Sequence, residues 1–195
     1  MGKNVAVTSR TLRDLLILCC MIFLALLIVA KLEMQHAIRS SGPFMVIDGD
    51  TLSDKGKRLR LRGMDAPELG QICTRPGGTY DCGHGARAGL IHLIEKGSVE
   101  CFGTGGDQDR YGRTLVTCRS GEDDLGQQMV LLGLAVADGD HHMAEVEARR
   151  AQRGIWAGSF ERPEDWRRLQ RLETREPGGW LQTFLAGLLG WREAE

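Results

Sequence analysis

The longest hydrophobic run of the chain lies near its N-terminus. It extends without interruption from Leu15 to Ala30 and is followed by Lys31. As a helix it would span roughly 24 Å, a little less than the ~30 Å hydrocarbon core of a bilayer. The long side chains of Arg13 and Lys31 can reach the two interfaces and make up the difference. Because the run is apolar on every face, it indicates a transmembrane helix rather than a buried core helix.

Basic residues before this run predict its orientation. Lys3, Arg10 and Arg13 precede it, which favours an N-terminus in the cytoplasm. The segment around Gln35-His36-Ala37 lacks the small residues that mark a signal-peptide cleavage site. We therefore expect residues 1–31 to be an uncleaved signal anchor. The rest of the chain would then lie outside the cytoplasm, on the periplasmic or extracellular side of the membrane.

After a polar segment at 32–43, which we interpret as a tether, the pattern changes to short strands and helices. Residues 57–62 alternate strictly, with Leu59 and Leu61 on one face and three arginines on the other. This pattern predicts a half-buried strand that presents its guanidinium groups to solvent. Further strands are expected at the ranges 44–47, 99–102 and 114–118, and helices at 84–96, 125–137 and 144–153. Strands with helices packed against them indicate an α+β domain over residues 44–168.

The C-terminal region, residues 169–195, forms a tail with one apolar segment from Trp180 to Trp191. This segment is compatible with an interfacial membrane helix and with a last packing element of the domain. The 195 residues leave room for one ordinary domain plus such appendages. A formal net charge of −1 removes the simplest argument for a nucleic-acid partner, although basic residues cluster locally at 55–62.

Four cysteines lie outside the apolar run: Cys73, Cys82, Cys101 and Cys118. They allow three disulfide pairings, and a zinc site is a weaker alternative because no pair has CxxC spacing. An oxidising compartment favours disulfides. Because Cys101 and Cys118 fall in the two strands of a predicted hairpin, we expect them to form one bridge. Cys73 and Cys82 would then form the other.

Three short motifs carry the candidate chemistry. The first is Ile47-Asp48-Gly49-Asp50-Thr51-Leu52, two carboxylates around a glycine. The second runs from Arg60 to Glu68 (RLRGMDAPE), a basic strand that leads into a turn with acids. The third is Asp109-Arg110-Tyr111-Gly112-Arg113. Each motif alone is common and usually structural. The occurrence of all three in this order is improbable as a coincidence.

Taken together, these motifs resemble the thermonuclease (staphylococcal nuclease-like) family over residues 46–156. The resemblance implies an OB-fold barrel of five strands with three helices, and a calcium-dependent nuclease that acts on DNA or RNA. By position, Asp50 and Asp65 would be carboxylate ligands of the cation, and Ala66 would contribute its backbone carbonyl. The best-known member of the family has threonine at the position of Ala66, but a backbone ligand survives that change.

The same correspondence assigns the remaining roles. Arg60, Glu68 and Arg113 match the catalytic positions, and Arg110 and Tyr111 are candidate contacts to the substrate phosphate. An aromatic residue that members often carry is absent from residues 136–139, where this chain reads VADG. Base stacking is therefore expected to differ from that of other members.

The chemistry of phosphodiester hydrolysis requires such a set of residues. A hard, oxygen-liganded cation neutralises the phosphate charge and orients water, and the all-oxygen donors suit calcium. Arginine forks match phosphate oxygens, and a glutamate can accept the proton of water. The main alternative is an OB-fold module, tethered to the membrane, that binds nucleic acid or protein without cutting. We expect a monomer, with DNA or RNA as the substrate and the membrane as its only other partner.

Overall fold

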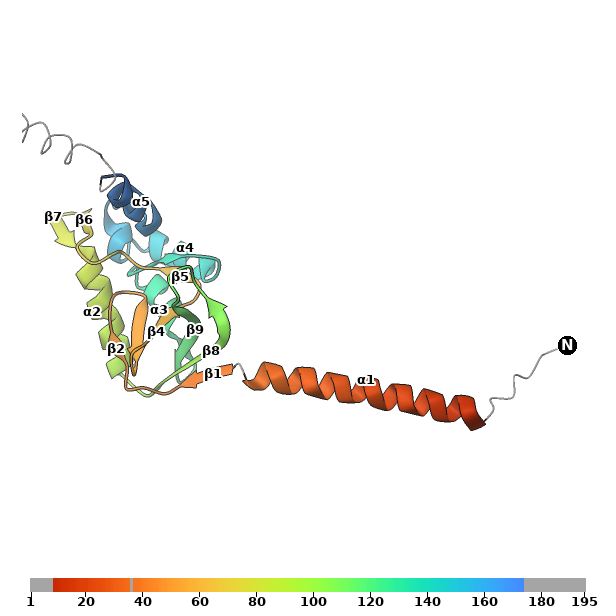
Figure 1. Cartoon of the computed structure of the whole chain (residues 1–195). Coiled ribbons are helices and arrows are strands. Elements are labelled where there is room, and N and C mark those ends of the chain that lie inside the picture. The colour runs from red at the N-terminus through yellow and green to blue at the C-terminus, as the bar shows by residue number, and fades with distance from the viewer. Residues whose placement is uncertain (1–8, 36, 174–195) are drawn as a thin grey trace, which may run out of the picture.

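A long apolar helix precedes the folded domain, as Figure 1 shows. The computed structural model describes residues 9–35 and 37–173. Helix α1 covers Ser9–Gln35, so it is longer than the predicted run from Leu15 to Ala30. Within it, Thr11–Leu32 has a mean hydropathy of 3.0 and is not buried by the rest of the protein. Among the described residues it is the one helix that is long and apolar enough to cross a membrane. A signal sequence can have the same length and apolar character.

The domain begins almost directly after α1. Strand β1 (Ala37–Ser40) pairs with β8 (Val99–Gln108), with Ala37 opposite Thr104 and Ser40 opposite Cys101. A third of the proposed tether, residues 37–40, thus lies in the sheet. The sequence did not reveal this pairing because Arg39 and Ser40 look like linker residues. Their backbone nevertheless adds an edge strand, and Arg39 contacts the Glu100 carboxylate at 3.0 Å.

The main sheet has the strand order β1-β8-β9-β4-β3-β2, and β10 pairs with β9. All neighbours are antiparallel except β4 and β9, which are parallel. The strands not yet defined are β2 (Met45–Val46), β3 (Thr51–Asp54), β4 (Lys57–Leu61), β9 (Thr114–Ser120) and β10 (Asp123–Asp124). The parallel pair places Arg60 of the second motif opposite Leu115, which lies two residues after the third motif.

The described part of the domain contains five helices, four of them α-helices. They are α2 (Cys82–Glu95), α3 (Leu125–Leu131), α4 (His142–Arg150), the 3₁₀ helix η1 (Gly154–Ala157) and α5 (Pro163–Glu173). Asp81 caps α2 by accepting a bond of 2.8 Å from the His84 amide, and Asp124 caps α3 in the same way. The prediction of three domain helices is therefore wrong in number, because α5 is an additional one.

Two further predictions need correction. The expected helix over 125–137 ends at Leu131, because Gly133 turns with φ of 67° and its backbone crosses close to that of Arg153. Val136 and Ala137 instead form β11, which pairs with β5 (Met64–Asp65). This pair is separate from the main sheet, so the strand pairing of the described residues does not form the closed five-stranded barrel that was expected. The α+β class itself is confirmed.

The hydrophobic core lies between the main sheet and the helices. Leu59 and Leu61 are buried, as their alternation predicted, and they belong to one cluster with Leu90 of α2 and Met129 of α3. A smaller second cluster contains Cys73, Cys82, Val136 and Ile155, with Trp156 and Phe160 packed against it. The apolar tail segment from Trp180 to Trp191 lies outside the described residues.

Both expected disulfides are present. Cys101 and Cys118 face each other across β8 and β9, and Cys73 and Cys82 connect strand β6 (Ile72–Arg75) to the start of α2. Strand β7 (Gly78–Asp81) completes the β6–β7 hairpin. The two bridges therefore fasten the main sheet and the hairpin separately.

Removal of the Cys101–Cys118 bridge should destabilise the domain. The cysteines are 17 positions apart and fully buried, so the bridge restricts the unfolded chain. We expect Cys101→Ala/Cys118→Ala to lower the free energy of unfolding by about 3 kcal/mol. The measurement is urea denaturation of the full chain in detergent, followed by circular dichroism. Cys19→Ala/Cys20→Ala is the control, because those cysteines are free and exposed on α1. Equal stability of the two double variants would contradict the assignment.

Candidate functional site

The first site residue, Asp50, lies in a tight turn between β2 and β3. Its amide donates to the Asp48 carboxylate at 3.0 Å, and its carboxylate accepts from the Thr51 hydroxyl at 2.7 Å. A glycine is required in this turn because a Cβ at Gly49 would lie only 2.6 Å from the Cβ of Ala66. The glycine thus brings the Asp50 turn against the residue that follows Asp65.

Arg60 joins Asp50 to Asp65. One terminal nitrogen of its guanidinium donates to Asp50, and the other donates to Asp65 Oδ1 at 2.7 Å. The Arg60 side chain is 11% exposed, so the prediction that it faces solvent is wrong for this residue. It turns inward because both carboxylates are buried and need a counter-charge. Two aspartates from different motifs thereby come to opposite ends of one guanidinium.

Arg113 approaches Asp50 from the third motif. Its Nη1 donates to the Thr51 hydroxyl at 2.9 Å and lies 3.5 Å from Asp50 Oδ1. Asp109 fixes this arginine by accepting from its Nε at 2.7 Å and from its amide at 3.0 Å. The pKa of Asp109 is below its ordinary value, because these bonds and one from the Tyr111 amide outweigh the effect of burial. Sequence reasoning assigned no role to Asp109, although its place at the start of the turn is typical of an anchoring aspartate.

Glu68 is held by a residue that the sequence did not single out. The Glu68 amide donates to the Gln71 side chain at 3.0 Å, and the Gln71 amide donates back to the Glu68 carbonyl at 2.9 Å. Gln71 is completely buried. Its side-chain nitrogen donates to the Glu161 carbonyl at 2.7 Å, just before α5. A buried glutamine in a loop gives no sequence signal that distinguishes it from a surface residue.

A third arginine, Arg167 of α5, also enters the site. Its two terminal nitrogens lie 3.0 and 2.9 Å from the two carboxylate oxygens of Asp65, and one of them lies 2.7 Å from Glu68 Oε1. The pKa of Arg167 is raised, because these bonds outweigh the lowering effect of burial. The Pro163-Glu164-Asp165 start of α5 could have indicated a helix. Nothing in the sequence places Arg167 against Asp65.

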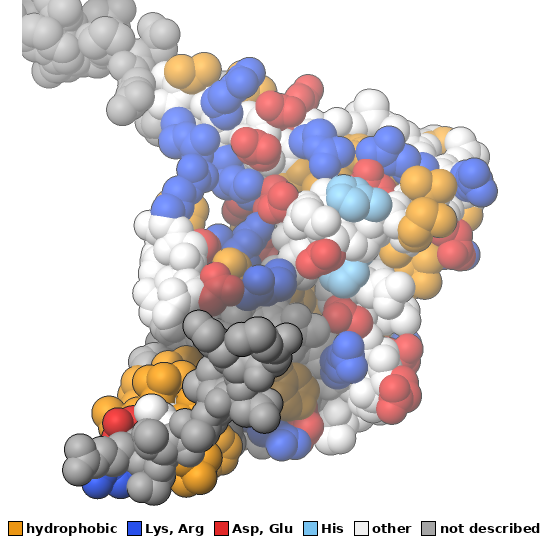
Figure 2. All heavy atoms as spheres, turned by 90° about the vertical axis from the view of Figure 1, so that its right-hand side faces the viewer, with side chains coloured by type: hydrophobic (Ala, Val, Ile, Leu, Met, Phe, Trp, Pro, Cys, Tyr) orange, Lys and Arg blue, Asp and Glu red, His pale blue; other side chains and the backbone are white. Residues whose placement is uncertain are grey.

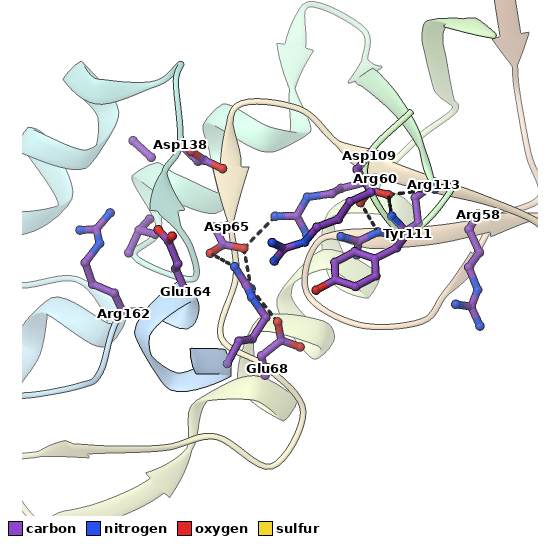
Figure 3. A pocket seen from close by; sticks show the side chains of 14 residues that line it. Arg58, Arg60, Asp65, Glu68, Asp109, Tyr111, Arg113, Asp138, Arg162 and Glu164 are labelled. Carbon is purple, nitrogen blue, oxygen red and sulfur yellow. Dashed lines mark hydrogen bonds and ion pairs between the residues drawn. The ribbon is translucent and has the colours of Figure 1, made fainter. Parts of the chain in front are cut away.

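These groups surround an open pocket of about 600 Å³. In Figure 3, Glu68 and Asp65 lie on one side of it, and Tyr111, Asp109 and Arg113 lie on the other. Arg110 also lines the pocket, stacked on the exposed Tyr111 ring with its guanidinium carbon 4.9 Å from the ring centroid. The face drawn in Figure 2 carries mixed basic and acidic side chains rather than a purely basic surface. The lining of the pocket is mixed as well. Its acids are Asp65, Glu68, Asp109, Asp138 and Glu164, and its arginines are Arg58, Arg60, Arg110, Arg113, Arg162 and Arg167.

The carboxylates of the site have the character of ligands for a hard cation. Burial raises the pKa of Asp50 to about 7, although Arg60 and Arg113 oppose this effect, and a bound cation would favour the charged carboxylate and lower this pKa again. Asp50, Asp65 and the buried Ala66 offer only oxygen donors, which fits calcium or magnesium better than softer metals. Among the described residues there is no group of three or more His, Cys, Asp or Glu side chains arranged for a metal. Backbone carbonyls and water would therefore have to complete the coordination.

Comparison with known proteins finds relatives of the folded domain. Residues 58–158 match the family described as "Staphylococcal nuclease homologue". The chain is 33% identical over 141 residues to the succinoglycan biosynthesis protein ExoI of Rhizobium meliloti (strain 1021), a match that covers 66% of this chain and 73% of that protein. It is 36% identical over 131 residues to the probable staphylococcal-like nuclease CAN2 of Oryza sativa subsp. japonica, covering 64% of this chain and 32% of the relative.

A fungal relative gives a similar result. The chain is 30% identical over 128 residues to the probable endonuclease LCL3 of Paracoccidioides brasiliensis (strain Pb03), which covers 55% of this chain and 36% of that protein. The chain thus spans about a third of the length of these plant and fungal relatives. Arg60, Asp65, Glu68 and Arg113 lie inside the matched region, whereas Asp50 and α5 lie outside it. Since the match covers slightly more than half of the chain, this protein belongs to the staphylococcal nuclease family.

Proposed function

We propose that this protein is a calcium-dependent nuclease that hydrolyses phosphodiester bonds of DNA, RNA or both. One observation carries the proposal: Arg60 joins two buried carboxylates, and Arg113 and Glu68 line the same pocket. Relatives named as nucleases support the same class of reaction. A pocket that holds both acids and arginines suits a cation and a phosphate together, since each neutralises the other's charge.

Asp50, Asp65 and the carbonyl of Ala66 would hold the cation. When bound, it would supply positive charge to the phosphate and a position for water. The chain prepares this site by keeping both aspartates buried around Arg60. The tight contact between Gly49 and Ala66 holds the two ligand segments together.

The arginines would bind the reacting phosphate. Arg60 and Arg113 are largely buried and held by aspartates, so their planar forks are already oriented before substrate arrives. They would stabilise the additional negative charge that develops on the phosphate oxygens during attack. Arg110 and Tyr111 are more exposed and would contact the substrate at the edge of the pocket.

Glu68 would act as the general base. Its side chain is 32% exposed and lies in the pocket, so a water molecule can reach it. The Glu68 carboxylate would take the proton of that water as the oxygen attacks phosphorus, and the oxygen of the leaving nucleotide would depart with the bond's electron pair. Gln71 keeps this glutamate's backbone in place.

A module that binds nucleic acid without cutting is the alternative function. Such a module would need the arginines but would have no use for a solvent-accessible glutamate beside two buried aspartates. The complete set of acids therefore favours catalysis. Loss of turnover in a variant that still binds substrate separates the two functions.

We also propose that α1 anchors the protein in a membrane with the domain outside the cytoplasm. The length and apolar character of Thr11–Leu32 support the anchor. The basic residues before it support the orientation. The two disulfides agree with an oxidising compartment.

The glutamate is expected to be essential for turnover. Glu68→Gln keeps the size of the side chain but removes its basicity, so kcat should fall by roughly 10²–10⁴-fold while substrate binding changes little. The measurement is kcat and KM of the full chain in detergent, on single-stranded and duplex DNA, with calcium and with a chelator.

Arg62→Gln is the matched control for that experiment. Arg62 is exposed and pairs with Asp107 on the surface, away from the buried aspartates, so its loss should change kcat less than about threefold. Activity that persists in the chelator, or turnover of Glu68→Gln equal to that of the control, would contradict the mechanism.

The orientation of α1 can be tested in spheroplasts. Protease added outside should digest the domain while α1 stays in the membrane fraction, because the domain follows the helix on the outer side. A cytoplasmic protein should remain intact in the same sample. If the domain is protected from protease until the membrane is opened, the proposed orientation is wrong. If the mature protein begins after Ala30, the helix is cleaved and does not anchor the protein.

A further inference from the structure

Helix α5 adds a component to the pocket that the family match does not include. The match ends at residue 158, and α5 covers Pro163–Glu173. Arg162, Glu164 and Arg167 from this region line the pocket. Figure 3 shows Arg162 and Glu164 on the side of the pocket opposite Tyr111 and Arg113. The segment therefore forms one wall of the proposed active site.

The contacts of Arg167 are directed at the acids of the site. Its guanidinium donates to both carboxylate oxygens of Asp65, at 3.0 and 2.9 Å, and to Glu68 at 2.7 Å. Charge-assisted and bidentate bonds of this kind are among the stronger hydrogen bonds in proteins. Arg167 thus occupies one proposed cation ligand and the proposed base simultaneously.

The chain leading into α5 is fastened to the domain. The Thr74 amide donates to the Ser159 carbonyl at 2.9 Å, and buried Gln71 donates to the Glu161 carbonyl at 2.7 Å. Gly158 packs so closely on the β6–β7 hairpin that a Cβ there would lie 2.0 Å from the Thr74 carbonyl oxygen. These contacts fix the start of α5, so the fold itself holds Arg167 close to the site.

Each of the three acids already faces a guanidinium group without a cation. Asp50, Asp65 and Glu68 face the guanidinium groups of Arg60, Arg113 and Arg167. A calcium ion would lie about 2.3–2.6 Å from a carboxylate oxygen of Asp65. The Arg167 nitrogens are 2.9–3.0 Å from those same oxygens, so the two cations would repel each other at close range.

Of the two arginines on Asp65, Arg167 is the one that can leave. Arg60 belongs to a strand with neighbours on both sides, and its side chain is 11% exposed. Arg167 belongs to a peripheral helix, and its side chain is 22% exposed. Rotation of the Arg167 side chain would release Asp65 and Glu68 without disturbing the sheet.

We propose that Arg167 competes with the divalent cation for Asp65, while the same guanidinium also occupies Glu68, so that α5 sets the cation concentration at which the site is loaded. The proposal rests on the proposed function, because it assumes that Asp65 is a cation ligand. In the cation-free protein Arg167 holds the metal ligand and the base together. Cation binding removes Arg167 from Asp65 and frees Glu68 for water.

Calcium binding without substrate tests the competition directly. Isothermal titration calorimetry of the full chain in detergent, with calcium chloride alone, should give a Kd about tenfold lower for Arg167→Gln than for the wild type, which is the fold-change that corresponds to about 1.4 kcal/mol. Arg168→Gln is the matched control: Arg168 is exposed at the next position of α5, so its loss removes the same charge without the contact. Its Kd should stay within about twofold of wild type.

A second variant tests the bidentate geometry of the Arg167 guanidinium separately from its positive charge. Arg167→Lys keeps a positive charge but cannot form the bidentate contact, so its Kd should lie between those of wild type and Arg167→Gln. It also replaces Arg167→Gln if that variant does not fold, as judged by circular dichroism. A Kd for both Arg167 variants that equals or exceeds the wild-type value would overturn the inference.

The variant Asp65→Asn tests the proposed cation site itself. It therefore shows whether a negative result with the Arg167 variants contradicts the role of α5 or the proposed function. Loss of calcium binding in Asp65→Asn upholds the cation site, so unchanged affinity in the Arg167 variants would then refute only the role of α5. Wild-type calcium affinity in Asp65→Asn would instead refute Asp65 as a ligand, and the competition with it.

Discussion

The contact of one buried guanidinium with two buried carboxylates organises this protein. Arg60 lies between Asp50 and Asp65, which come from a turn before β3 and from β5. Removing three charges from water costs several kcal/mol per ion, and only close pairing offsets that cost. The strands that carry these residues must therefore stay in register, because a shift of one residue would turn Arg60 away and remove the guanidinium that the two aspartates share.

The residues of the site could be predicted from the sequence better than their environment could. The alternation of residues 57–61 correctly placed Leu59 and Leu61 in the core, yet it wrongly placed Arg60 in solvent. An alternating pattern reports which face is apolar, but not whether acids from elsewhere gather on the other face. The helix predicted over 125–137 failed for a related reason, since the close crossing of Gly133 and Arg153 is a tertiary contact.

The role of α5 illustrates the limit of local patterns most clearly. Its first residues carry ordinary helix-start signals, but Arg167 looks like any arginine on a polar helix. Its position depends on Gln71 and on the β6–β7 hairpin, which lie about ninety residues earlier in the chain. The Cys73–Cys82 bridge connects that hairpin to α2. A hairpin that carries a disulfide thus holds the segment that leads into α5.

The direct passage from α1 into the sheet has a consequence for which molecules the enzyme can meet. Only residue 36 separates α1 from β1, whereas a free linker over residues 32–43 could extend to about 40 Å. With α1 in a bilayer, the domain would stay at the lipid surface and could not search the surrounding fluid. Substrates would then be chosen by delivery to the surface, so that whatever brings nucleic acid to the membrane decides what is cut.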